Sequence, residues 1–86
     1  MNINDLIAIV KKKLINNIKI EKIEIEDKSF LHKNHSGHQE GKFHLKLIII
    51  SGELQKLNRI ESNKKIFKIL NDEMDRYIHS LQILIN

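Results

Sequence analysis

The stretch that decides the fold is FHLKLIIIS, at residues 43–51. Apolar and polar residues alternate at its start, and the run from Leu47 to Ile50 is then continuously apolar. Alternation with a period of two is typical of a strand with one buried face, whereas a continuous apolar run indicates cover on both faces. The stretch therefore predicts a central β-strand, which Ser51 and Gly52 end.

A second strand is expected upstream of the central one. Over residues 21–27, Ile23 and Ile25 alternate with lysine and glutamate, as in a half-buried strand. The segment between the two strands contains Gly37 and Gly41 and is expected to be a long loop. Two strands joined in this way can pair as an antiparallel hairpin.

Helical spacing appears on both sides of this hairpin. Residues 4–16 place Leu6 and Val10 on one helical face, with Asn4 expected as the N-cap. Residues 62–77 predict a longer helix capped by Ser62, and a short helical turn is expected before it around residues 54–60. The apolar stripe of the longer helix comprises Ile66, Phe67, Ile69, Leu70, Met74 and Tyr77.

The alternation at residues 78–83 predicts a third strand. Because a helical crossover precedes it, this strand should run parallel to the central one. The expected fold class is α+β in the order αββααβ, with a three-stranded mixed sheet and helices packed on one face. With 86 residues, the chain is expected to form a single domain over residues 1–86.

Composition argues against several classes of function. The chain has no cysteine, so it has no thiolate ligand or nucleophile of its own. No apolar run approaches the roughly 18 residues of a membrane span, and no secretory signal is recognisable, so a cytoplasmic protein without membrane contact is expected. Because a nucleophile elbow and a glycine-rich phosphate loop are both missing from the sequence, we do not expect an enzyme.

Histidines are the residues with the clearest chemical potential. His32, His35 and His38 recur at a spacing of three, which makes them candidate metal ligands, although solvated loop histidines are the simpler interpretation. His44 lies in the central strand, and a structural hydrogen bond is its expected role. His79 lies in the third strand, where a histidine satisfied within the sheet is the simpler interpretation.

Four motifs in this order resemble the BolA family across nearly the whole chain. They are Asp27-Lys28-Ser29, Gly37-His38, the FHLKLIIIS strand, and Ile78-His79-Ser80-Leu81 after a long helix. The resemblance implies a fold like the type II KH domain. It also implies an adaptor that binds a monothiol glutaredoxin with glutathione and shares a [2Fe–2S] cluster with it. Such an adaptor would hold or transfer the cluster, or sense iron or redox state.

The resemblance further implies a set of ligands and contacts. His38 matches the family's loop ligand, with His32 and His35 as substitutes. The family's histidine in an R-H-R-like motif at the start of the long helix corresponds here to Asn63, whose amide is a poor ligand for iron. The expected partner surface contains Asn63, Lys64, Lys65 and His79.

A nucleic-acid-binding transcriptional regulator is the alternative. The net charge is +4, which favours a nucleic acid such as DNA as a partner. Its contacts would be Arg59, Lys64 and Lys65. The GxxG backbone clamp of KH domains is absent from the sequence, and most basic residues are lysines, which grip phosphate less specifically than arginine. Alone, the chain is expected to be a monomer or a weak homodimer.

Overall fold

The structure is a computed structural model that describes residues 1–29 and 42–86. The candidate ligands His32, His35 and His38 lie outside the described residues. The described elements, in chain order, are α1 (Ile3–Asn17), β1 (Lys22–Asp27), β2 (Phe43–Ile50), α2 (Gly52–Gln55), α3 (Arg59–Ile69), α4 (Asn71–Arg76) and β3 (Ile78–Ile85). None of these helices is long and apolar enough to cross a membrane.

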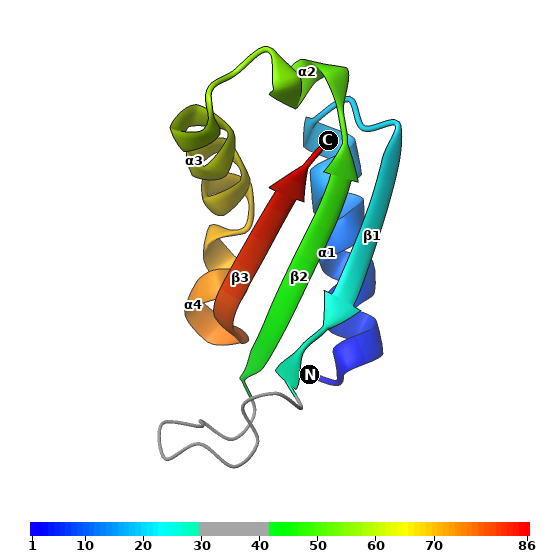
Figure 1. The fold of residues 1–86 in the computed structure, drawn as a ribbon. Helices are drawn as coiled ribbons and strands as arrows, with labels where there is room; N and C mark the ends of the chain where they lie inside the picture. Colours follow the sequence, from blue (N-terminus) through cyan, green and yellow to red (C-terminus); the bar gives the residue numbers. More distant parts are fainter. Residues whose placement is uncertain (30–41) are drawn as a thin grey trace.

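The strands form one three-stranded sheet in the order β1-β2-β3 (Figure 1). β1 pairs with β2 in the antiparallel sense, with Ile25 opposite Leu47. β3 pairs with β2 in the parallel sense, with Ile83 opposite Leu47. The mixed sheet, its central strand and the crossover direction that the sequence predicts are therefore confirmed.

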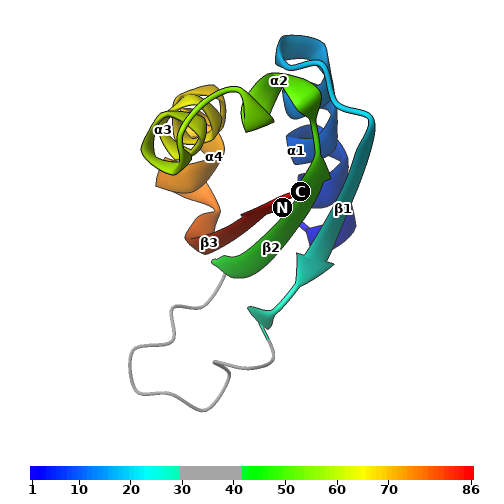
Figure 2. The ribbon, with the colours of Figure 1, turned by 45° about the horizontal axis from the view of Figure 1, so that its top comes forward.

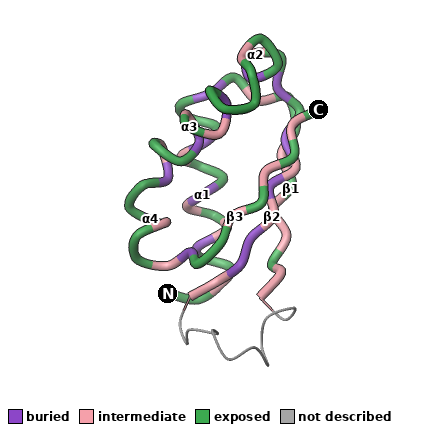
Figure 3. The backbone as a smooth tube through the Cα atoms, turned by 60° about the vertical axis from the view of Figure 1, so that its left-hand side comes forward, coloured by how far each residue is buried: buried purple, intermediate pink, exposed green. Residues whose placement is uncertain are grey.

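The helices pack on one face of this sheet, and Figure 2 shows them on the same side. Alternate residues of β2, namely Leu45, Leu47 and Ile49, are buried there together with the α1 residues Leu6, Val10 and Leu14. In Figure 3, buried positions follow β2 and the inner side of the helices. Cover on both faces of β2 was expected at its end, but Ile50 is 42% exposed, so this expectation is wrong. The apolar run there reaches an uncovered face of the sheet.

The helix α1 begins earlier than its apolar pattern suggests. Its N-cap is Asn2, whose side-chain oxygen accepts a hydrogen bond of 2.8 Å from the backbone N–H of Asp5. Asn4 lies inside the first turn, so the expectation that Asn4 caps the helix is wrong. An asparagine three residues before the accepted N–H is the geometry that satisfies an unpaired donor of the first turn.

The predicted helix over residues 62–77 is two helices, α3 and α4, which meet at Leu70. α3 begins at Arg59, because Asn58 and Glu61 form a reciprocal capping box ahead of it. Ser62 is therefore not a cap; it is buried inside the helix, and its hydroxyl donates to the carbonyl of Leu54 at 3.0 Å. Phe67 is 38% exposed and does not belong to the core stripe.

One ion pair joins the first and last helices. The ammonium of Lys13 on α1 lies 2.6 Å from carboxylate oxygen Oε2 of Glu73 on α4. Glu73 is buried, and its second oxygen has no hydrogen-bond partner within residues 1–29 and 42–86. Since a buried carboxylate needs a compensating charge, Lys13 fixes the position of α4 against α1.

Candidate functional site

The segment 30–41 leaves and rejoins the described chain at one end of the sheet. The carboxylate of Asp27 accepts a hydrogen bond of 2.9 Å from the backbone N–H of Ser29, a local turn that ends β1. The hydroxyl of Ser29 then accepts the backbone N–H of His44 at 3.0 Å, and the N–H of Lys28 donates to the carbonyl of His44 at 2.7 Å. The Asp27-Lys28-Ser29 motif thus ties the end of β1 to the start of β2.

His44 is a structural residue at this end of the sheet. It is 6% exposed, and its ring nitrogen Nδ1 lies 2.6 Å from the hydroxyl oxygen of Ser80 on β3. This bond links β2 to β3 beside the ends of the segment 30–41. The expectation that His44 serves in structural hydrogen bonding is confirmed.

His79 occupies an irregular position in β3. Phe43 pairs with Ile78 and His44 pairs with Ser80, so His79 is an extra residue at a bulge between two paired positions. Its side chain is exposed, and its ring centroid lies 4.9 Å from that of His44. It has no side-chain hydrogen bond within the part of the chain that the structure describes, so no described residue of the sheet satisfies its ring nitrogens.

The bulge gives His79 an exposed position that its sequence spacing does not reveal. A bulge interrupts the alternation of a strand and redirects the side chain of the extra residue. Here it presents an imidazole at the end of the sheet where Ser29 and Lys42 mark the limits of the segment 30–41. An exposed neutral imidazole is a good ligand for a borderline metal such as iron.

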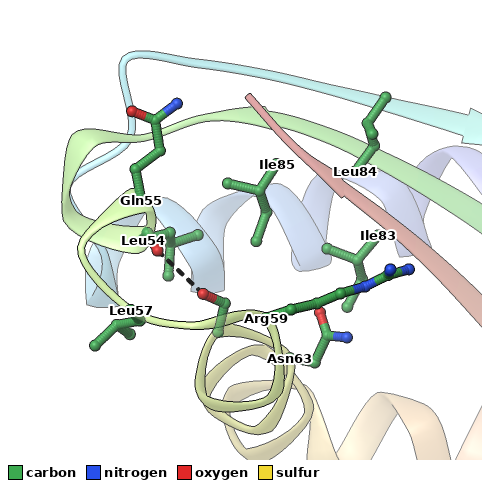
Figure 4. Close-up of a pocket in the computed structure, with 9 residues that line it drawn as sticks. Leu54, Gln55, Leu57, Arg59, Asn63, Ile83, Leu84 and Ile85 are labelled. Atoms are coloured by element: carbon green, nitrogen blue, oxygen red, sulfur yellow. Dashed lines mark hydrogen bonds between the residues drawn. The ribbon is translucent and has the colours of Figure 1, made fainter.

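A second surface lies between α3 and β3. Arg59 and Asn63 on α3 line a groove with Ile83 and Leu84 on β3. Figure 4 shows the Arg59 side chain running along this groove beside Ile83, with Asn63 next to it. The groove continues toward Phe67 and Gln82, and none of this surface was recognised in the sequence as a groove.

The two lysines that follow Asn63 differ in their availability. Lys64 is exposed and forms no ion pair with any described residue. Lys65 lies 2.9 Å from a carboxylate oxygen of Glu53 on α2. The pKa of Glu53 is lowered, first because Lys65 donates this hydrogen bond and then because the backbone N–H of Lys19 also donates to the carboxylate. Lys65 therefore has an intramolecular role in holding α2 against α3.

The structure separates residues that the sequence placed on one partner surface. Asn63 lies beside Ile83 and Leu84, whereas His79 precedes Ile83 by four residues along β3. At about 3.3 Å per residue, His79 and Ile83 lie roughly 13 Å apart along β3. Asn63 belongs to the α3–β3 groove, and His79 lies toward the opposite end of β3.

The described donor set fits part of a shared iron–sulfur site. The chain has no cysteine, and within residues 1–29 and 42–86 no group of three histidine, aspartate or glutamate residues could hold a metal ion. Asn63 offers an amide, which is a poor iron ligand. The exposed imidazole of His79 fits such a site, and the remaining ligands must come from elsewhere.

Comparison with known proteins places this fold among relatives. A family model described as BolA-like protein matches residues 14–86. The DNA-binding transcriptional regulator BolA of Haemophilus influenzae is 25% identical over 75 residues, which cover 87% of this chain and 70% of that protein. SufE-like protein 1 of Arabidopsis thaliana is 28% identical over 80 residues, and the chain spans only 22% of its length.

Solved structures give the same result for the fold. The BolA domain of SufE1 from Arabidopsis thaliana superimposes with a TM-score of 0.77 at 26% identity, covering 92% of this chain and 87% of that one. BolA1 from the same plant gives a TM-score of 0.75 at 23% identity, with the same coverage of both chains. With its α+β fold, its mixed sheet and a family match over residues 14–86, the chain belongs to the BolA-like protein family.

Proposed function

We propose that this chain is a non-catalytic adaptor that binds a monothiol glutaredoxin with glutathione and takes part in holding, transferring or sensing a [2Fe–2S] cluster. The observation that carries the proposal is the position of His79. Its exposed imidazole lies on a bulge at the end of the sheet where the segment 30–41 begins and ends. His38 lies four residues before Lys42 in the sequence, and Lys42 is the residue at which the described chain resumes.

The proposed ligand set divides the cluster between two proteins. His79 and a histidine of the segment 30–41 would bind one iron, with His38 as the first candidate and His32 and His35 as substitutes. Cysteine thiolates of glutaredoxin and glutathione would bind the other iron, a division chemically similar to known two-histidine, two-cysteine ligation. When bound, the cluster supplies one-electron redox chemistry and transferable iron and sulfide.

The surroundings of His79 support its role as a ligand. The hydrogen bond between His44 and Ser80 joins β2 to the residue after His79, and the backbone N–H of Phe43 donates to the carbonyl of Tyr77 at 2.8 Å before the bulge, so the backbone that carries His79 is held on both sides. A ligand whose backbone is fixed loses less conformational entropy on binding. Asn63 is then not required for the cluster, because it lies beside Ile83 in the α3–β3 groove.

Reconstitution with a monothiol glutaredoxin tests this proposal. The chain is mixed with the glutaredoxin, glutathione, iron and sulfide, and size-exclusion elution is recorded with visible circular dichroism. We expect a heterodimer whose spectrum differs from that of the glutaredoxin alone. His79→Ala and His38→Ala should each weaken this spectrum, while the matched variant Asn63→Ala should leave it unchanged. A cluster spectrum that depends on Asn63 and not on His79 would contradict the proposal.

A second candidate function is nucleic-acid binding, which the position of Arg59 favours. One relative is named a DNA-binding transcriptional regulator. Arg59 is exposed in the groove without an ion-pair partner in the described chain, and Lys64 follows it on the same helix. Lys65 contributes less, because it pairs with Glu53.

Salt dependence tests this second candidate. Fluorescence anisotropy of a labelled DNA duplex should show an affinity that falls steeply as salt rises, since bound phosphates release counterions. Arg59→Ala should reduce the salt slope by about one, as expected for one lost phosphate contact. The candidate is excluded if binding is absent at low salt or indifferent to ionic strength.

A further inference from the structure

β3 leaves one long edge of the sheet without a partner strand. It pairs only with β2 among the described elements. The backbone N–H of Asn86, just after β3, donates to the carbonyl of Ile49 on β2 at 2.8 Å. Because backbone groups of a strand point alternately to its two sides, the groups of Leu81, Ile83 and Ile85 point away from β2. Three successive outward positions therefore offer donors and acceptors at this edge.

The composition of β3 lacks the features that usually protect an edge strand. Such strands carry lysine, proline, or inward-pointing charges that discourage pairing with another chain. β3 has the sequence IHSLQILI, eight residues without proline, lysine or any carboxylate. Leu84 at its end is 45% exposed. An uncharged exposed edge of this length is suited to strand addition by a partner.

The α3–β3 groove provides side-chain contacts beside this edge. Asn63 and Phe67 on α3 line it together with Gln82 and Leu84 on β3. Phe67 and Leu84 are both large apolar residues with more than a third of their surface exposed. An added strand would present alternate side chains to this wall and to solvent, as the period of a strand requires.

The charge of the groove indicates the chemistry of its occupant. The charged residues that line it are Arg59 and Lys46, and no aspartate or glutamate lines it in the described part of the chain. The charge of Lys46 is shared between the groove and β1, because Lys46 pairs with Glu26 on that strand. Arg59 has no ion-pair partner within residues 1–29 and 42–86 and lies along the groove (Figure 4). A planar guanidinium favours a carboxylate partner.

We propose that the outer edge of β3 and the α3–β3 groove bind an extended acidic peptide segment of a partner protein, which adds to the sheet as a fourth strand. Backbone hydrogen bonds to Leu81, Ile83 and Ile85 supply affinity, and Arg59 selects a carboxylate. A second copy of this chain would present the same positive groove, since a two-fold interface pairs identical surfaces. Along β3, Ile83 lies about 13 Å from His79 and Leu81 lies about 7 Å from it, so the proposed surface does not include His79.

Selection from a random peptide library tests the proposal, because it does not require the partner protein to be identified first. A phage-displayed library of random peptides of about twelve residues, long enough to span the edge, is selected on the full chain. We expect recovered peptides in which aspartate or glutamate alternates with β-branched or aromatic residues. On titration of the best synthetic peptide, the amides of Leu81, Ile83 and Ile85 should become protected from hydrogen exchange.

Two variants and one control make the test specific. Arg59→Glu should weaken peptide binding by about tenfold or more, the usual cost of losing a charge-assisted hydrogen bond. The variant should fold, because Arg59 begins α3 and an acidic residue there favours the helix dipole. Ile83→Pro should also weaken binding, since it removes an outward donor and no bond to β2. Lys12→Glu, an equal change of charge at an exposed position on α1, should bind normally.

Other outcomes would overturn the proposal. No peptide above background, or selected peptides without acidic residues, would remove the acidic strand as occupant. Protection of the same amides in a concentration-dependent dimer would assign the edge to a second copy of the chain. Competition of a single-stranded oligonucleotide for the groove, with no acidic peptide recovered, would assign it to nucleic acid. The variant His79→Ala should lose glutaredoxin binding and keep peptide binding. The two proposals can therefore fail separately.

Discussion

Replacing the half-buried Lys13 by methionine should destabilise the fold more than replacing an exposed lysine. The Lys13 ammonium lies 2.6 Å from Glu73, and the exposed fractions of their side chains are 39% and 7%. Breaking a fully buried pair costs roughly 3–5 kcal/mol, because it leaves an uncompensated charge. Since water reaches Lys13, the expected cost is lower, about 1–3 kcal/mol. The loss corresponds to a fall of about 4–24 °C in Tm, at roughly 4–8 °C per kcal/mol for a chain of this size.

Replacing the partner residue, Glu73, should cost less stability. Glu73→Met removes the buried carboxylate, including the oxygen that has no partner among the described residues, and leaves Lys13 free to turn to water. Urea denaturation followed by circular dichroism at neutral pH gives both values. The exposed neighbour Lys12→Met is the control, with an expected change within about 0.5 kcal/mol. The reasoning is refuted if Lys13→Met matches Lys12→Met, or if Glu73→Met is the more damaging change.

Three further predictions concern stability. Ile49→Ala should cost about 2–5 kcal/mol in urea denaturation, whereas Ile50→Ala on the uncovered face should cost less than about 1 kcal/mol. Asn58→Ala should cost about 1 kcal/mol in the same assay, because it removes the capping box of α3. The lowered pKa of Glu53 stabilises the fold above the usual value of 4.5, and this contribution should be lost as pH falls through the lowered pKa. Acid titration of Lys65→Met should show a smaller loss; an unchanged profile would contradict this cause.

The sheet could be predicted from the sequence because strand periodicity is a local signal. Residues 43–51 and the alternation at Ile23 and Ile25 determine both strands and the buried face. The parallel direction of β3 follows from the helical crossover before it. The continuous apolar run of β2 wrongly predicted cover on both faces of its end, because Ile50 lies on a face that no described helix covers.

The helix limits show a different kind of error. The capping box of Asn58 and Glu61 is present in the sequence, but the apolar stripe from Ile66 onward drew the predicted start to Ser62. Ser62 is buried because its hydroxyl bonds the carbonyl of Leu54, a contact eight residues away. Local capping chemistry is thus a better guide to the start of a helix than its apolar stripe.

The candidate site was only partly predictable. The histidine His79 was identified, but its exposure depends on a bulge whose register is set by pairing with Phe43 and His44. Pairing irregularities arise from contacts between distant segments, so no single stretch encodes them. The groove around Arg59 likewise depends on how α3 lies beside β3.

Pulsed electron paramagnetic resonance of the reduced complex tests the central claim most directly. The chain is labelled with ¹⁵N-histidine and reconstituted with an unlabelled monothiol glutaredoxin, glutathione, iron and sulfide. The account predicts coupling of the cluster to histidine nitrogen of this chain, reduced in His79→Ala and retained in Asn63→Ala. Coupling that is absent from the labelled complex, or that survives unchanged in His79→Ala, would contradict it.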